Sequence, residues 1–246
     1  MDNVLDNPVL SSLLGTHRGL AITAGRVARY PVEVSPFMGL PGDADEADWE
    51  QLIALAGDDA IVLVNGPERW PVGIEEVRRF AVLQMVASGE LTVRAAADDV
   101  VIERLSGADA AEMLDLAQRT EPGPFGVRTG ELGAYYGVRD GEKLVAMAGE
   151  RMRPAGWTEI SGVCTDPAYR GRGLAGVLME RVFRGASERG DRSFLHVFEG
   201  NAGAIRLYEA MGFTVRRSVV VSSYRKVGQA GSEGVADAVD RVLADG

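Results

Sequence analysis

The chain has 246 residues, of which 46% are hydrophobic and 25% are charged. This length predicts one or two domains, and the composition is that of an ordinary folded protein. The single cysteine, Cys164, excludes an internal disulfide, and with only two histidines no bound metal is expected. No early Lys or Arg marks a leader, and no uncharged run approaches the roughly 18 residues of a membrane helix. A cytoplasmic location without a membrane partner is expected.

The first part of the chain has a mixed pattern that predicts an α/β domain over residues 1–95. The sequence predicts strands over residues 26–34, 60–64 and 80–86. Apolar residues at helical spacing predict a helix over residues 45–56, with Asp43 as its N-cap. A change from small polar residues to the strand-like run VVIERL places a boundary near residue 95. No motif in this part assigns it a function.

The second part, residues 96–226, alternates strands and helices more clearly and predicts an α/β (α+β) domain. Strands are expected over residues 100–105, 143–152, 157–165, 193–198 and 213–224, and helices over residues 109–119, 174–188 and 201–211. The turn Arg153-Pro154-Ala155-Gly156 predicts a hairpin. Residues 227–246 are expected to form a flexible or helical acidic tail.

The net charge of −10 is unevenly distributed. Residues 1–95 carry −7, residues 96–226 are neutral, and residues 227–246 carry −3. An acidic chain repels the phosphate backbone of nucleic acids, so no nucleic-acid partner is expected. The same charge slightly favours a cationic acceptor.

The segment DPAYRGRGLAG, residues 166–176, is the most informative part of the sequence. A predicted strand ends there, and a loop with Arg and Gly leads directly into an amphipathic helix. Backbone N–H groups at a helix N-terminus bind phosphate, and Gly171 and Gly173 allow the close approach of a ligand. No Gly-Lys-Ser/Thr follows, and the glycine spacing differs from that of a dinucleotide-binding fold.

Here the sequence resembles the GNAT acetyltransferase superfamily. The run Arg170-x-x-Gly173-x-Ala175 is similar to its acyl-CoA loop, Arg/Gln-x-x-Gly-x-Gly/Ala. The resemblance covers about half of the chain. It implies a mixed, twisted central sheet flanked by helices, in which the fourth and fifth strands splay apart. A degenerate second copy of the fold over residues 1–95 is left open.

A second run extends the resemblance: Asn201-x-x-Ala204-x-x-x-Tyr208-x-x-x-Gly212-Phe213. The resemblance implies an N-acetyltransferase that moves an acetyl group from acetyl-CoA to a primary amine of a small molecule or peptide. The amine would attack directly in a ternary complex, and Tyr208 would protonate the leaving thiolate. The residues implied to bind acetyl-CoA are Val163, Cys164, Thr165, Arg170, Gly171, Arg172, Gly173, Leu174, Ala175, Gly176 and Asn201.

The general base is the least defined part of this interpretation. Glu159 is the first candidate, with Glu150 and His196 as alternatives, and a paired structural group is the other interpretation for each. For Cys164 a small buried hydrophobe is expected rather than a nucleophile. A non-catalytic acyl-CoA-binding regulatory module is the alternative function. The acceptor, the acyl chain length and a homodimeric state are left open.

Overall fold

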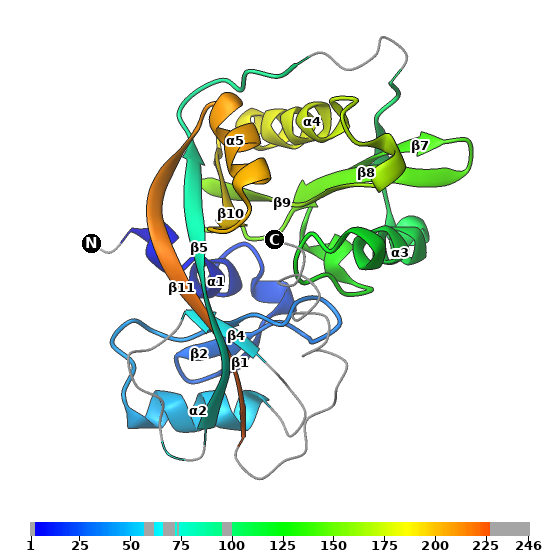
Figure 1. The fold of residues 1–246 in the computed structure, drawn as a ribbon. Helices are drawn as coiled ribbons and strands as arrows, with labels where there is room; N and C mark the ends of the chain where they lie inside the picture. The colour runs from blue at the N-terminus through cyan, green and yellow to red at the C-terminus, as the bar shows by residue number, and fades with distance from the viewer. Residues whose placement is uncertain (1–2, 57–61, 66–71, 73, 95–99, 227–246) are drawn as a thin grey trace.

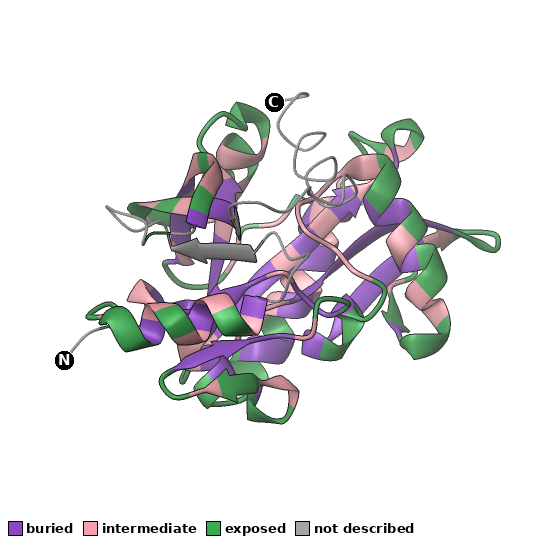
Figure 2. Ribbon diagram, turned by 90° about the horizontal axis from the view of Figure 1, so that it is seen from below, coloured by how far each residue is buried: buried purple, intermediate pink, exposed green. Residues whose placement is uncertain are grey.

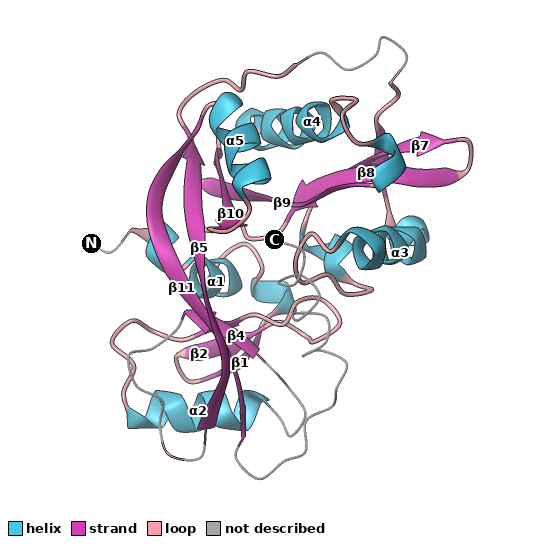
Figure 3. Ribbon diagram, in the orientation of Figure 1, coloured by secondary structure: helices cyan, strands magenta, loops and turns pink. Residues whose placement is uncertain are grey.

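The computed structural model describes residues 3–56, 62–65, 72, 74–94 and 100–226. In this part, the main sheet has eight strands in the order β4-β11-β5-β10-β9-β8-β7-β6 (Figure 3). The strands are β4 (Val62–Asn65), β5 (Ile74–Ala87), β6 (Glu103–Leu105), β7 (Tyr135–Asp140), β8 (Lys143–Glu150), β9 (Trp157–Thr165), β10 (Arg192–Phe198) and β11 (Phe213–Lys226). Strands β9 and β10 are parallel and the other neighbours antiparallel, which confirms the predicted mixed sheet.

Helices cover both faces of this sheet (Figure 1). On one face lie α4 (Leu174–Glu188) and α5 (Ala202–Ala210), and on the other lie α3 (Ala110–Thr120) and α1 (Pro8–Leu14). Leu178 and Val182 of α4 pack with Leu195 of β10, whereas Met113 and Leu116 of α3 pack with β7 and β8. Figure 2 shows the same layering, because buried residues gather on the strands and on the inner sides of the helices.

Residues 22–56 add a small layer at one end of the sheet. It contains β1 (Ile22–Ala24), β2 (Val27–Arg29), β3 (Met38–Gly39) and α2 (Glu46–Ala56). Five 3-10 turns complete the described elements: η1 (Val4–Asp6), η2 (Arg18–Leu20), η3 (Gly107–Asp109), η4 (Thr129–Leu132) and η5 (Pro167–Tyr169). Leu52 of α2 and Met38 of β3 share a core with Tyr224 of β11, so this layer packs on the end of a main-sheet strand.

Asp45, rather than the predicted Asp43, caps the N-terminus of α2. The Asp48 backbone N–H donates to Asp45 Oδ1 at 3.0 Å, and the Asp45 N–H donates to Asp48 Oδ2 at 3.1 Å. Asp43 instead forms an ion pair with Arg26. The reciprocal bonds satisfy two helix-terminal donors, which Asp43 is placed too early to do.

Strand β5 joins the N-terminal part of the chain to the main sheet. It lies between β10 and β11, and its register with β11 runs from Ala87↔Phe213 to Ile74↔Lys226. The two strands extend along the height of the molecule in Figure 1. The sheet thus continues across the boundary predicted near residue 95. The sequence predicted a strand over residues 80–86, but strand propensity alone does not specify a partner.

Strands β9 and β10 pair over three positions and then separate. The register is Trp157↔Arg192, Thr158↔Ser193 and Glu159↔Phe194. Beyond Glu159, no described strand pairs with β9 on the side that faces β10. Gly162, with φ +61°, lies at a register shift between β8 and β9. A bulge there bends β9, and the separation matches the splay expected from the sequence.

Most of the other predicted elements of the second part are confirmed. The predicted helices, the hairpin and the strand over residues 193–198 correspond to α3, α4, α5, β8–β9 and β10. The strand expected over residues 26–34 is reduced to β2, because a turn begins at Pro31. Residues 227–246, predicted as an acidic tail, lie outside the described residues.

Candidate functional site

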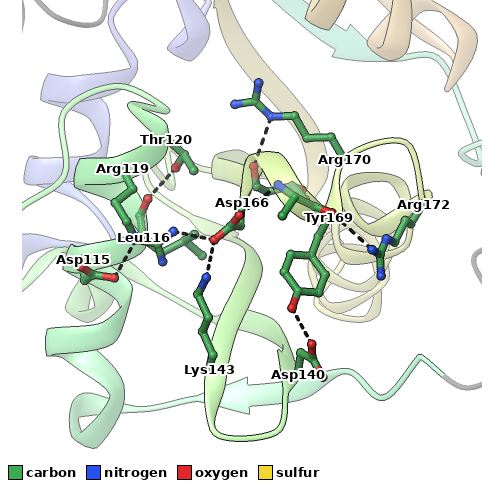
Figure 4. Close-up of polar contacts among 12 residues, drawn as sticks. Asp115, Leu116, Arg119, Thr120, Asp140, Lys143, Asp166, Tyr169, Arg170 and Arg172 are labelled. Atoms are coloured by element: carbon green, nitrogen blue, oxygen red, sulfur yellow. Dashed lines mark hydrogen bonds and ion pairs between the residues drawn. The ribbon is translucent and has the colours of Figure 1, made fainter.

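The glycine-rich loop, residues 170–176, is anchored to the sheet and to α3 through Asp166 (Figure 4). The Ala168 N–H donates to Asp166 Oδ1 at 3.1 Å. Asp166 Oδ2 accepts from Lys143 Nζ at 2.8 Å and from Arg119 Nη1 at 2.7 Å. The hydrogen bond from Lys143, with those from Ala168 and Arg119, lowers the pKa of Asp166 to about 2. The carboxylate therefore stays ionised and holds the start of the loop in place.

The backbone of this loop leaves several N–H groups free. Gly171 and Gly173 have φ values of +78° and +79°, a conformation that only glycine adopts without a steric cost. Gly173 is the N-cap of α4 and offers no side-chain acceptor. The N–H groups of Leu174, Ala175 and Gly176 have no hydrogen-bond acceptor among the described residues. Such a helix N-terminus binds anions.

The same loop carries two arginines, Arg170 and Arg172. Arg170 Nε donates to the Thr165 carbonyl at 3.4 Å, and the Arg172 guanidinium lies 4.7 Å from the centroid of the Tyr169 ring. The Tyr169 hydroxyl in turn donates to Asp140. Neither Arg170 nor Arg172 forms an ion pair with another described residue. The loop therefore presents positive charge together with free N–H donors, a combination that suits a phosphate group.

The last residues of β9 pack on both faces of the sheet. Val163 packs in the core under α4, and Cys164 packs in the core over α3. On one side, Cys164 and Thr165 pair with Met147 and Ala146 of β8; no described strand pairs with them on the other. Burial raises the pKa of the Cys164 thiol to about 11. The thiol stays protonated at neutral pH, which favours its interpretation as a small buried hydrophobe.

Helix α5 carries the other two predicted site residues. Asn201 caps the helix, because its Oδ1 accepts from the Ala204 N–H at 3.0 Å. The Asn201 Nδ2 group has no partner among the described residues. Tyr208 packs edge-on against Phe213, with 6.2 Å between ring centroids. Burial raises its pKa to about 12, and its hydroxyl has no partner in the described part of the chain. Both side chains thus retain polar atoms for a ligand.

Glu159, predicted as the general base, is a fully buried ion-pair partner. Its exposed fraction is 0%. Its two oxygens accept from Arg151 Nη2 at 2.7 Å and Arg151 Nε at 2.8 Å, and His196 Nδ1 lies 2.7 Å from Oε1. Burial by itself would raise the pKa of Glu159, but Arg151 and His196 together lower it to about 2. A carboxylate with this pKa is a weak proton acceptor, so the base assignment is corrected.

The two alternative bases are also held by neighbours. Glu150 Oε1 accepts from Arg189 Nη2 at 2.7 Å. Arg216 donates to Gln84 Oε1 at 2.6 Å, so the Gln84 Nε2 group faces His196 Nε2 at 3.2 Å. An amide N–H can only donate; His196 Nε2 therefore accepts, and His196 Nδ1 carries the proton toward the carboxylate of Glu159. Neither group is free to take a proton from a substrate.

Arg151 and Gln84 were missed in the sequence, and a signal existed for only one of them. Arg151 follows β8 directly. Its backbone N–H donates to the Glu159 carbonyl at 3.1 Å, so the two residues lie opposite each other across the predicted hairpin. Opposite charges that face each other across a hairpin indicate an ion pair. Gln84 lies on β5, far from the motif, and no local pattern links it to His196.

Among the described residues, no three His, Cys, Asp or Glu side chains form a cluster that could hold a metal ion. In the same part of the chain, no helix has the length and apolar character needed to cross a bilayer.

Comparison with known proteins agrees with this fold and site. The family model described as FR47-like protein matches residues 135–222. N-alpha-acetyltransferase RimI of Mycobacterium tuberculosis is 32% identical over 127 residues, which are 47% of this chain and 79% of that protein. Mycothiol acetyltransferase of Corynebacterium glutamicum is 37% identical over 83 residues, which are 33% of this chain and 28% of that protein.

A solved structure of a GNAT-family protein from Novosphingobium aromaticivorans extends the similarity to nearly the whole chain. It is 39% identical, with a TM-score of 0.81, and the match covers 92% of this chain and 99% of that one. The chain belongs to the GNAT family of acetyltransferases. It is accordingly an acyltransferase with acetyl-CoA as its co-substrate.

Proposed function

We propose that this protein transfers an acetyl group from acetyl-CoA to a primary amine by direct attack in a ternary complex. The observation that supports this most is the glycine-rich loop: within the described part of the chain, the N–H groups of residues 174–176 lack acceptors, and Arg170 and Arg172 of the same loop form no ion pair. The loop lies where β9 has separated from β10. An anion site next to an unpaired strand edge suits a ligand with a pyrophosphate and an amide-bearing arm.

In this proposal each predicted binding residue has a defined task. The backbone of residues 170–176 binds the pyrophosphate, with Arg170 and Arg172 supplying positive charge. The free edge of β9 at residues 163–165 hydrogen-bonds the amides of the pantetheine arm, as an added strand would. The Nδ2 group of Asn201 binds the arm from the side of α5.

The chemistry needs three proton movements: two from the nitrogen of the amine and one to the leaving thiolate. The amine must lose a proton before its nitrogen attacks the thioester carbonyl, because most amines are protonated at neutral pH. The C–N bond forms, negative charge develops on the carbonyl oxygen, and a backbone N–H of β9 stabilises it. The C–S bond then breaks, and the Tyr208 hydroxyl gives its proton to the leaving thiolate. The attacking nitrogen gives up its second proton, which returns through water to the Tyr208 oxygen and leaves a neutral amide. The high pKa of Tyr208 keeps that proton in place until it is needed.

Release of CoA thiol is the direct test of this function. Acetyl-CoA binding would be measured by calorimetry, and thiol release with peptides bearing a free N-terminus, polyamines, aminoglycosides and amino acids. The peptides belong in this panel because RimI is named for N-alpha-acetylation. Release with one class of amine supports the proposal. Tight binding without release from any amine would support the regulatory module instead, and no binding would contradict both. The cytoplasmic location and the homodimer stay predictions.

Replacement of Gly173 by Ala is expected to weaken acetyl-CoA binding about tenfold, equivalent to about 1.4 kcal/mol. A Cβ atom strains the left-handed backbone by about 1–2 kcal/mol and shifts the N–H groups that follow. Gly190→Ala is the matched control, because Gly190 has φ +82° at the other end of α4 and open space around it. Both variants should lose similar stability. Calorimetry should show weaker binding only for Gly173→Ala; equal affinities would contradict the proposed loop function.

Replacement of Tyr208 by Phe is expected to lower kcat about 100-fold. Loss of a general acid typically lowers the rate about 100- to 10,000-fold, and the smaller effect is expected here because a thiolate is a good leaving group. The KM for acetyl-CoA should stay near the wild-type value. The hydroxyl has no protein partner among the described residues, so thermal stability should change little. Steady-state kinetics with the best amine measure both constants. An unchanged kcat would remove Tyr208 from the mechanism.

A further inference from the structure

A groove lies along the C-terminal half of α4, at the opposite end of this helix from the glycine-rich loop. The segment at the end of β5, residues 87–91, forms one wall, and residues of α4 between 180 and 188 form the other. Residues 191–193, where β10 begins, line the groove between these walls. Figure 1 shows the segment after β5 passing over α4. The groove has a volume of about 820 Å³, within the range of small-molecule sites, and it is separate from the proposed acetyl-CoA site.

A buried hydroxyl at the floor of the groove has no hydrogen-bond partner. Ser193 is 1% exposed, and its Oγ atom has neither donor nor acceptor among the described residues. Side chains alternate along a strand, so Ser193 lies on the same face of β10 as Leu195 and Val197, which pack in the core under α4. The hydroxyl therefore points toward α4, into the groove that Ser193 lines. An unpartnered buried polar group costs free energy and is rare, and a ligand in the groove would supply the missing partner.

The walls beside this hydroxyl are apolar. Phe183 of α4 and Leu91 of the segment after β5 are partly buried, pack against the main core and line the groove. Ala87, at the end of β5, is buried and lines it as well. Contact with such surfaces favours a carbon chain, because apolar surface on both sides is then removed from water. The middle of the ligand is therefore expected to be apolar.

Most charged side chains of the groove are already engaged. Arg184 pairs with Glu180 of the same helix. The guanidinium of Arg192 lies 4.2 Å from the centroid of the Trp157 ring. Asp191 accepts a hydrogen bond from a threonine hydroxyl of β9 at 2.8 Å. These groups are therefore poor candidates for the charge that would select a ligand.

Two carboxylates at the rim of the groove remain. Glu90 and Glu188 are exposed and line the groove from its two walls. Neither forms a hydrogen bond or an ion pair through its side chain with another described residue. Glu188 also ends α4, where the helix dipole adds partial negative charge. The open side of the groove therefore favours a cation, whereas its floor offers a neutral hydroxyl.

We propose that this groove binds a small aliphatic cation with a neutral polar group at its other end, such as an amino alcohol. The Ser193 hydroxyl, which can donate or accept, forms a hydrogen bond with the neutral group. The carbon chain lies between Phe183 and Leu91, and the ammonium group lies near the carboxylates of Glu90 and Glu188, where water still reaches it. The charged end does not take the deep position, because burial of an unpaired charge is costly. The groove is thus a second ligand site, in addition to the site for acetyl transfer.

The test begins with probes that share one carbon chain: 5-amino-1-pentanol, pentylamine and 1-pentanol. Each is titrated into the whole protein, and two-dimensional NMR records which backbone amide signals move and the Kd of each probe. The amino alcohol should move the signals of residues 88–91 and 191–193 and should bind most tightly, because it alone contacts both ends of the groove. Pentylamine and pentanol should each bind about fivefold more weakly, since each lacks one polar contact.

Variants then assign each end of the probe to its partner. Ser193→Ala should weaken binding of the amino alcohol about fivefold and leave pentylamine unchanged. Ser222→Ala is the matched control, because the Ser222 Oγ of β11 is also buried without a partner among the described residues but does not line the groove. The double variant Glu90→Gln/Glu188→Gln should weaken binding of both amines about fivefold and leave pentanol unchanged. Glu142→Gln, in the exposed β7–β8 turn, is the control for charge and should change no Kd.

The pattern of losses decides between a ligand site and a structural feature. Loss at the hydroxyl end with Ser193→Ala and at the ammonium end with the double variant supports the proposal. It is overturned if no probe moves the signals of the groove, or if neither variant changes any Kd. Equal weakening by Ser222→Ala would also overturn it, because the effect would then come from the fold rather than from contact with the probe. Release of CoA thiol tests acetyl transfer separately, so either proposal can fail without the other.

Discussion

A fragment of residues 96–226 is expected not to fold, although it contains the complete family motifs. The fragment lacks β5, which lies between β10 and β11 in the sheet. Met85 of β5 belongs to the main core and Leu83 packs against it, and removal of a fully buried side chain of this size costs about 1.5–3 kcal/mol. Both neighbouring strands would also lose a hydrogen-bonded partner. These losses together are of the same order as the 5–15 kcal/mol that typically separates folded from unfolded states.

Near-UV circular dichroism and two-dimensional NMR of the fragment would measure this effect. We expect poor solubility, or dispersion typical of an unfolded chain, and no acetyl-CoA binding. The control is the whole chain with a protease site inserted near residue 96 and cleaved after folding. The two parts should stay associated, because β5 remains paired on both sides. A fragment that unfolds cooperatively and binds acetyl-CoA would show that residues 96–226 form an independent domain.

Replacement of Arg151 by Met is expected to destabilise the protein by about 3–5 kcal/mol, because it leaves a buried carboxylate without its partner. Glu159 is fully buried and takes two hydrogen bonds from the Arg151 guanidinium. The double variant Arg151→Met/Glu159→Leu should recover most of the loss, since apolar groups of similar volume replace a buried pair at little cost. Arg128→Met is the control: its pair with Glu131 is exposed, and its loss should cost less than about 1 kcal/mol.

The same pair predicts an acid dependence of stability. The pKa of Glu159 is lowered from 4.5 to about 2 in the folded protein. The unfolded state therefore binds the proton more tightly, and stability falls as the pH falls through this window. The stabilisation by ionised Glu159 is complete above about pH 4.5 and is lost toward pH 2. It amounts to about 3 kcal/mol at 1.36 kcal/mol per pKa unit. The free energy of unfolding, measured with urea between pH 6 and pH 3, should fall less steeply with pH in the double variant Arg151→Met/Glu159→Leu than in the wild type. Equal slopes would contradict this account.

The comparison of sequence with structure shows which site residues were predictable. The loop of residues 170–176, the cap at Asn201 and the start of α4 depend on glycine conformations and helix patterns within a few residues of each other. Glu159 was placed on the correct strand, but its role depended on Arg151 and His196, which only the folded sheet brings together.

The sequence by itself determined the local elements of the second part of the chain, among them the glycine-rich loop that leads into α4. Tertiary structure decided that β5 completes the sheet, that Glu159 is an ion-pair partner, and that Gln84 orients His196 across 112 residues of sequence. Turns, caps and amphipathic helices are set by interactions between residues close in sequence. Strand partners and the pKa of a buried carboxylate depend on groups distant in the chain, which meet only when the core forms.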